Sequence, residues 1–405
     1  MITNLRAQNF KSWKDTGDLR LAPLTGFFGT NSSGKSSVLQ VLLMMKQTAE
    51  SSDLNTVLKL AKDDPDDKRI YADLRSFRDI IHGHNTTLDL SLSLAWKDPV
   101  QALEAFTGNG SGPIRFDVEV RDEGGVTSLR SFCYSGNGAT SEALPPVNSP
   151  VHFYSVRRPA DDLRELGNSL EECLNSLIYL GPLRPEPEPS YGWSGNAPSS
   201  VGRRGEFAVQ ALIASRDKAP HVERQVVAWL AKLGLADEMS LQPIAQGRED
   251  YEVRIQQTAA SARVLLPDVG FGVSQVLPVL VQCAYAKRGS ILILEQPEMH
   301  LHPSAQSALA DVLIEAVTKR NVQIIFESHS EHLLRRIQRR IAEEKFLARD
   351  TSIYFCEMEN GESKATPLEL TEDGYIKNWP HDFFGDEMAD LVAMTEASID
   401  RKTRK

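Results

Sequence analysis

A short glycine- and serine-rich stretch near the amino terminus constrains this chain most. Residues 29–36 fit the pattern G-x-x-x-x-G-K-[ST], with Gly29 and Gly34 as its glycines. Between a strand and a helix, such a loop turns backbone N–H groups toward a bound phosphate. Residues 24–28 have the apolar character of a buried strand, and an apolar stripe at helical spacing follows the loop. A serine-rich turn with a stray lysine is the alternative, and the order of strand, loop and helix argues against it.

The same loop predicts which residues hold a nucleotide. Lys35 is expected to reach the β- and γ-phosphates, and the Ser36 hydroxyl is expected to bind Mg²⁺. Trp13 or Phe10 could stack on an adenine, although such aromatic residues more often close the edge of a core, which is the interpretation we favour. The nucleotide-binding residues predicted in the loop are Gly29, Asn31, Ser32, Ser33, Gly34, Lys35, Ser36 and Ser37.

Composition limits the class of protein. At 405 residues the chain is long enough for two lobes, because single cores stop growing near about 250–300 residues. The net charge of −10 provides no overall basic field that would recruit nucleic acid. No apolar run approaches the roughly 18 residues of a membrane span, and nothing near the start resembles a signal peptide. The sequence therefore predicts a cytoplasmic protein without a membrane partner.

Hydrophobic periodicity distinguishes the first half from the middle of the chain. Residues 88–94, 114–120 and 129–134 alternate apolar with polar side chains, which predicts an antiparallel sheet with one solvated face. Residues 169–178 begin with a capping box, Ser169 with Glu172, which predicts a helix that leads into a proline-rich connection.

Two continuous apolar runs in the last third predict buried parallel strands. One run ends at Glu295, and the other, residues 322–326, leads into 327–330. Polar residues therefore gather at the carboxyl ends of the strands, where open α/β sheets bind ligands. A helix over residues 276–286 precedes the first run, with Pro278 in its first turn, where proline is tolerated.

These patterns divide the chain into four segments. Residues 1–160 are expected to form an N-terminal lobe with the phosphate loop and the antiparallel subdomain, and residues 161–262 a helical or irregular insertion. Residues 263–358 are expected to form a C-terminal lobe, and residues 359–405 an extension.

Several motifs occur in one order along the chain. After the phosphate loop come D-x-G-x-G-x-S-Q at 268–275, E-x-P-E-x-H-L-H-P at 295–303, S-H-S at 328–330 and N-W-P-x-x-F-F at 378–384. This order resembles the RecF/SMC/OLD-type branch of the ABC ATPases, and within it the bacterial predicted ATPases of the AAA family that end in an uncharacterised domain. The resemblance implies an α/β P-loop NTPase, an ABC ATPase head with a mixed central sheet, an antiparallel β subdomain and a helical insertion. It also implies ATP and Mg²⁺ as ligands.

The resemblance assigns roles to the polar residues that follow the two apolar runs. Glu295 matches the acid that holds Mg²⁺, and His329 matches a switch histidine that contacts the γ-phosphate. Gln296 stands where related ATPases have a glutamate that deprotonates the attacking water, and a glutamine cannot accept that proton. Three alternatives follow: hydrolysis is slow, or Glu298 substitutes as the base, or a glutamate was changed at this position to trap bound ATP.

A second loop implies an oligomer. Gly270, Gly272 and Ser274 match the signature loop of the family, with Gly270 in place of the usual serine. In the family this loop contacts a nucleotide bound to another subunit, so the resemblance implies a homodimer with shared ATP sites, which could assemble further. His300 and His302 fall in the matching dimer-contact loop, and a zinc site there would lack further ligands.

A basic helix face leaves nucleic-acid binding open. It carries Arg335, Arg336, Arg339 and Arg340, and follows His329. These arginines could bind nucleic-acid phosphates or pair with Glu343 and Glu344, and we favour the pairing.

An ATP-driven switch is the function predicted first. In this hypothesis the ATP state is read by a separate effector, a nuclease or toxin of phage defence or DNA repair, because the 76 residues after His329 are too few for the nuclease domain of OLD-type relatives. A non-hydrolysing ATP-dependent scaffold and the ATPase subunit of a transporter are the alternatives.

Overall fold

The computed structural model of the protein describes most of the chain. The described residues are 1–53, 56–61, 70–97, 112–136, 139–140, 161–245, 247–380, 383–384 and 387–403.

The central sheet carries the phosphate loop. In spatial order its strands are β17 (Glu362–Pro367), β16 (Thr351–Glu359), β4 (Leu24–Gly29), β15 (Gln323–Glu327), β14 (Ile291–Glu295) and β9 (Leu177–Leu180). Neighbouring strands run parallel except for β16 with β17, so the sheet is mixed as expected. Glu295 pairs with Glu327, and Glu327 pairs with Phe27. The carboxyl ends of β4, β15 and β14 therefore meet at one edge of the sheet, which is the edge that binds ligands in open α/β sheets.

A second sheet, the antiparallel one, confirms the alternating pattern. Its strands are β1 (Ile2–Phe10), β2 (Trp13–Asp15), β3 (Leu19–Arg20), β5 (Leu90–Trp96), β6 (Ile114–Asp122), β7 (Thr127–Gly136) and β8 (Ala139–Thr140). All of their pairings are antiparallel. Leu90, Leu92 and Leu94 are buried, whereas Asp89 and Arg121 form an ion pair of 2.6 Å on the polar face.

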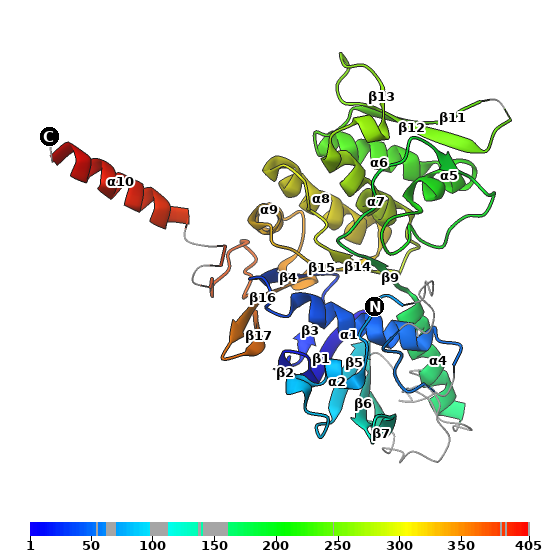
Figure 1. Ribbon diagram of the computed structural model, residues 1–405, viewed down its shortest axis with the longest axis vertical. Coiled ribbons are helices and arrows are strands. Elements are labelled where there is room, and N and C mark those ends of the chain that lie inside the picture. Colours follow the sequence, from blue (N-terminus) through cyan, green and yellow to red (C-terminus); the bar gives the residue numbers. More distant parts are fainter. Residues whose placement is uncertain are drawn as a thin grey trace.

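Helices cover both faces of the central sheet. The α-helices in the described part of the chain are α1 (Lys35–Ala49), α2 (Phe77–Ile80), α4 (Asp161–Asn175), α5 (Ala208–Lys218), α6 (His221–Lys232), α7 (Phe271–Tyr285), α8 (Pro303–Arg320), α9 (Glu331–Ala342) and α10 (Glu387–Thr403). Figure 1 shows α5–α9 on one side of the central sheet, and α1 with the antiparallel sheet on the other. The side chains of β14 alternate between two hydrophobic cores. Leu292 and Leu294 pack into the core that includes α5–α9, and Ile291 and Ile293 pack into the core that includes α1 and the antiparallel sheet. None of the described helices is both long and apolar enough to cross a bilayer.

The segment around residue 170 differs from the sequence interpretation. The helix α4 begins at Asp161, so Ser169 lies inside it and is not its N-cap. The Ser169 hydroxyl instead accepts a hydrogen bond of 3.0 Å from Trp96 Nε1. Leu177 and Ile178 were expected at the end of the same helix but begin β9, because pairing with β14 and burial of Leu177 outweigh local helix signals.

A small antiparallel sheet also lies where only helical or irregular structure was expected. It comprises β10 (Tyr191–Gly192), β12 (Asp250–Gln256), β11 (Glu238–Pro243) and β13 (Val264–Leu265). Two buried positions, Val253 and Ile255, alternate with polar residues in β12 and pack into the core with α5 and α6. The strands are short and rich in charge, which hides the alternation in the sequence.

Pro278 does not lie in a first turn. The helix α7 begins at Phe271, so the proline is in its interior. Its ring packs against Gly205, where an added Cβ would lie only 2.5 Å from the Pro278 Cβ atom. Gly205 also has a φ of +86°, so glycine suits this position for both reasons.

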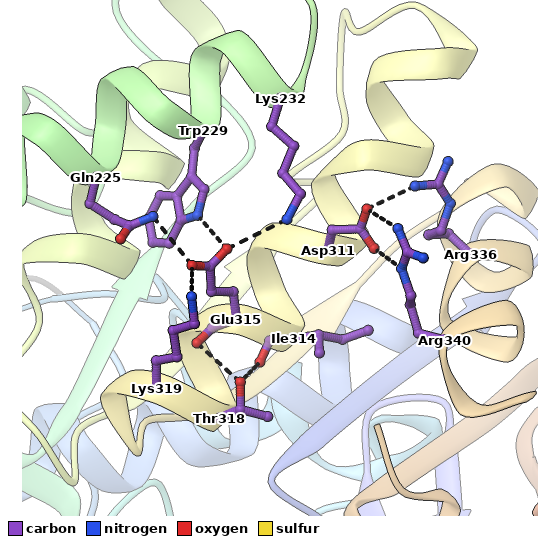
Figure 2. A network of polar contacts seen from close by, with 10 residues as sticks. All are labelled: Gln225, Trp229, Lys232, Asp311, Ile314, Glu315, Thr318, Lys319, Arg336 and Arg340. Carbon is purple, nitrogen blue, oxygen red and sulfur yellow. Dashed lines mark hydrogen bonds and ion pairs between the residues drawn. The ribbon is translucent and has the colours of Figure 1, made fainter. Parts of the chain in front are cut away.

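Two carboxylates of α8 join three helices (Figure 2). Asp311 accepts hydrogen bonds from Arg336 (2.8 Å) and Arg340 (2.7 Å) of α9. Burial opposes ionisation of Asp311, but the Arg340 hydrogen bond and the charges of both arginines lower its pKa on balance. One turn along, Glu315 accepts from Trp229 Nε1 of α6 at 3.0 Å. The helix α8 therefore fixes α9, and with it the residues that precede α9, relative to the body.

The basic face of α9 is neutralised by acids. Arg335 pairs with Glu331 at 2.9 Å and Arg339 with Glu343 at 2.7 Å, while Arg336 and Arg340 pair with Asp311. The sequence favoured pairing of these arginines with Glu343 and Glu344, and the pairing with Glu343 is confirmed.

The C-terminal segment returns to the phosphate-loop strand. Asn360 and Gly361, both with positive φ, turn β16 into β17 as expected for a hairpin. Phe383 and Phe384 then pack edge-on against Phe28 of β4. Residues 381–382 of the N-W-P-x-x-F-F run lie outside the described residues. The helix α10 stands apart from the body (Figure 1).

Candidate functional site

The phosphate loop needs its two glycines for steric reasons. Gly29 has a φ of +136°, and a Cβ there would lie 1.9 Å from the Cys356 carbonyl oxygen of β16. Gly34 has a φ of +88°, and a Cβ there would lie 2.5 Å from Ser363 Oγ of β17. Both positions therefore exclude any side chain. The loop packs closely against the β16–β17 hairpin at both glycines.

Trp13 supports the loop from behind. Its side chain is fully buried, and its Nε1 donates a hydrogen bond of 3.1 Å to the Gly34 carbonyl. Phe10 is fully buried as well. Neither ring has an exposed face for an adenine, so the favoured interpretation of these residues as a closed core edge is confirmed.

The Lys35 ammonium group lies within the curve of the loop. It donates to the Thr30 carbonyl at 2.6 Å and to the Gly29 carbonyl at 3.1 Å. Burial lowers the pKa of Lys35, against the opposing effect of the Glu327 charge. The chain thus holds a desolvated positive charge where the sequence predicts phosphate oxygens to bind.

Two buried glutamates lie at the ends of the adjacent strands β15 and β14. Ser36 Oγ donates to Glu327 Oε2 at 2.6 Å, and the Tyr179 hydroxyl donates to Glu295 Oε1 at 3.1 Å. Burial, and then the Glu327 charge, raise the pKa of Glu295 to about 7, and burial raises the pKa of Glu327. Hydroxyl and carboxylate oxygens are the ligands that Mg²⁺ takes in proteins, so this group fits that ion.

Glu327 is the site residue that sequence reasoning missed. It ends the second apolar run as Glu295 ends the first, and this equivalence was the available signal. Because β14 and β15 are parallel and in register, the two carboxylates become neighbours.

Most of the predicted loop residues meet Gln296 and His329 in one pocket of about 350 Å³, whereas Gly29 is not part of its lining. It is lined by Ser12, Asn31, Ser32, Ser33, Gly34, Lys35, Ser36, Ser37, Gln296, Glu327 and His329. Glu295 lies behind this lining, bonded to Tyr179. The structure thus brings together the loop, one residue from the end of β14 and two from the end of β15.

Gln296 is held by its backbone in an unusual conformation. Its φ is +43°, its N–H donates to the Glu327 carbonyl at 2.9 Å, and its own carbonyl accepts from Arg184 at 3.4 Å. The same Arg184 nitrogen donates to the Glu295 carbonyl at 3.2 Å. A left-handed backbone held by these two partners at a pocket wall is typical of functional positions, and Gln296 lines the pocket.

Glu298 is not brought to the pocket wall. It is buried, and its Oε1 accepts from Ser328 Oγ at 2.7 Å and from the His329 N–H at 3.0 Å. Burial raises the pKa of Glu298 despite these bonds. Its carboxylate is engaged in holding the turn that carries His329, so it is poorly placed to replace a base at residue 296.

His329 reaches the pocket from this turn. Its Nε2 lies 4.0 Å from Glu327 Oε1, and its side chain is partly exposed. Burial and then the Lys35 charge lower the pKa of His329. This shift favours the neutral imidazole, which can donate one hydrogen bond.

The signature loop lies elsewhere on the chain. Gly270, Gly272 and Ser274 are absent from the pocket lining, and Ser274 Oγ donates to the Phe271 carbonyl at 2.9 Å. Phe271 is 49% exposed and lies edge-on to His300, with ring centres 4.8 Å apart. Within the described residues, no group of three potential metal ligands includes His300 or His302.

Comparisons with known proteins find similar sequences and a similar fold. A family model described as an AAA ATPase domain matches residues 1–80 and 229–334, and one of a protein of unknown function (DUF3696) matches residues 348–394. The OLD nuclease of Thermus scotoductus is 24% identical over 351 residues, which cover 82% of this chain and 59% of that protein. The solved Smc head bound to the C-winged helix domain of ScpA aligns with a TM-score of 0.52 and 13% identity, over 92% of this chain and 98% of that one.

The role of Glu327 can be tested through its charge. We expect Glu327→Gln to raise the Mg²⁺ concentration for half-maximal ATP binding by about tenfold or more, because partners of metal ligands are worth 10–100-fold in affinity. Fluorescent-nucleotide titrations at stepped Mg²⁺ measure this shift. The matched control is Glu331→Gln, whose carboxylate pairs with Arg335 outside the pocket. An unchanged Mg²⁺ dependence in Glu327→Gln would contradict the assignment.

Proposed function

Because this chain is an ATPase of the SMC, RecF and OLD kind, we propose that it binds ATP with Mg²⁺ in the 350 Å³ pocket and hydrolyses it slowly. The observation that carries this proposal is the hydrogen bond between Ser36 and Glu327 beside the buried Lys35 ammonium. This hydrogen bond joins the start of α1 to the end of β15. The residues proposed to bind Mg²⁺ and those proposed to bind phosphate therefore line the same wall of the pocket.

Each residue of the pocket has a chemical task in this proposal. The loop N–H groups and Lys35 bind the phosphates, while Ser36, Glu327 and Glu295 hold the Mg²⁺, which would neutralise charge on the phosphate oxygens. His329 donates a hydrogen bond to the γ-phosphate. Glu298 positions His329 by accepting its backbone N–H.

Gln296 explains why hydrolysis would be slow. Its amide can orient a water molecule at the pocket wall, but it cannot take the proton that the water must lose. Glu298 would not compensate, since it is buried and does not line the pocket.

Phosphate release tests the pocket directly. We expect Lys35→Ala to abolish turnover and Gln296→Glu to raise it by about tenfold or more, because a positioned general base contributes 10²–10⁴-fold. Gln296→Ala is the control that removes the amide without adding a base. Equal turnover in wild type and Lys35→Ala would overturn the site. Tight ATP binding without release in wild type would instead favour the non-hydrolysing scaffold, which the glutamine at 296 makes the second candidate.

The proposed ATP site is shared between two copies of the chain. Its support is the separation of the signature loop from the phosphate pocket within one chain, together with an exposed Phe271 beside Gly270. In the proposed dimer, Gly270 and Gly272 of one copy face the γ-phosphate held by the other, which gives two equivalent sites.

Mixing two inactive variants tests this sharing. Gly270→Asp places a negative charge at an open position where an added Cβ meets no atom within 4 Å, so folding is preserved and phosphate is repelled. Mixed with Lys35→Ala in equal amounts, half of the dimers are mixed and each has one complete site, so we expect about a quarter of wild-type turnover. Gly270→Ser is the tolerated control. Failure of the mixture to recover turnover would contradict the shared site.

The ATP-closed dimer is further proposed to regulate a separate nuclease or toxin in antiphage defence or DNA repair. Support comes from similarity to a protein named OLD nuclease, of which the chain spans about three fifths. Tagged wild type and Lys35→Ala, purified from the native host with ATP, test the proposal. A partner recovered only with wild type, and whose activity on nucleic acid changes with ATP, is the expected result. Recovery of the same partner with both variants would contradict ATP control.

A further inference from the structure

We propose that a second cavity, of about 590 Å³, binds a nucleotide-sized phosphate ester such as a nucleoside monophosphate. It lies beside β9, the edge strand of the central sheet, between the ends of α1 and α4 and the turn that precedes β14. Its volume is within the 300–1,000 Å³ of typical small-molecule sites. None of its lining residues belongs to the ATP pocket.

Its rim carries positive charge without acidic partners. Lys287 and Arg288 are exposed in the turn between α7 and β14, and no carboxylate in the described part of the chain pairs with either. Arg203, from the loop before α5, lines the same cavity and donates to the Ile70 carbonyl. Three cations around one opening suit a phosphate group.

The acids of the cavity weaken this charge little. Glu50 is bonded to buried Lys46 at 2.6 Å and to the Tyr71 hydroxyl at 2.9 Å, so its charge is compensated inside the protein. Glu172 is the other acid of the lining, and it is exposed. Two cations at the rim thus remain in excess of the acids.

The inner wall offers ring surfaces and hydroxyl groups. Tyr71 and Tyr179 meet edge-to-face with ring centres 6.4 Å apart, which suits packing against a base or sugar. Ser176, Ser200 and Ser290 also line the cavity and can hydrogen-bond to ligand oxygens. A rim of cations in front of aromatic and hydroxyl groups is the combination that a nucleotide requires.

Tyr179 connects this cavity to the ATP pocket. Its ring lines the cavity, while its hydroxyl donates to Glu295 at 3.1 Å. A ligand that moves the ring therefore alters the support of a proposed Mg²⁺ residue. This link, unlike the binding itself, rests on the proposed function.

Calorimetric titration with AMP tests the binding. We expect one AMP per chain in wild type and in Lys35→Ala, since AMP lacks the phosphates that Lys35 holds. Lys287→Ala combined with Arg288→Ala should weaken AMP binding by about tenfold or more while ATP turnover stays at the wild-type level. Arg263→Ala combined with Lys364→Ala removes the same charge elsewhere on the surface and should change nothing. Absence of AMP binding, or its loss in Lys35→Ala, overturns the site.

The link is tested through the Mg²⁺ dependence of ATP turnover. Saturating AMP should shift the half-maximal Mg²⁺ concentration at least about twofold in wild type, and leave it unshifted in Tyr179→Phe, which still binds AMP. Turnover that ignores AMP overturns the link and leaves the ATPase intact. Loss of all turnover would instead refute the proposed function, while the calorimetric result stands.

Discussion

The parallel, in-register pairing of β4, β15 and β14 is the constraint on which the site depends. It brings Phe27, Glu327 and Glu295 to one level, so the phosphate loop and both carboxylates emerge at the same edge. The hydrogen bond from Ser36 to Glu327 then ties the start of α1 to that edge. Burial raises the pKa of both carboxylates, because each has lost water that a cation would replace.

Features that depend on neighbouring residues could be predicted from the sequence. The phosphate loop, the apolar runs of β14 and β15 and the alternation in β5 and β6 are local signals, and the structure has each of them. The hairpin turn at Asn360 and Gly361 is a signal of the same local kind, since its turn chemistry lies within the two residues that need positive φ.

Features that depend on distant partners could not be predicted. β9 lies at a helix end in the sequence, and only its pairing with β14 makes it a strand. Glu298 looked like an alternative base because it lies close to Gln296 along the chain, yet its carboxylate turns to Ser328 and the His329 N–H. Glu327 ends its apolar run as Glu295 does, but its hydrogen bond with Ser36, which lies far earlier in the chain, is evident only in the structure. In each case a contact between elements outweighs the local pattern.

The C-terminal segment is part of the nucleotide pocket's framework rather than an appendage. β16 pairs with β4 along its length, and its Cys356 carbonyl leaves Gly29 no room for a side chain. Ser363 Oγ of β17 likewise leaves no room for a Cβ atom at Gly34. Phe383 and Phe384 pack on Phe28, the residue before the loop. The loop conformation is therefore set from both ends of the sequence, so a movement of the segment from 348 onward would reach the phosphates through backbone contacts. That arrangement gives the region matched by the family model of unknown function a physical route to the proposed ATP site, while Asp311 keeps α9 and His329 fixed on the other side.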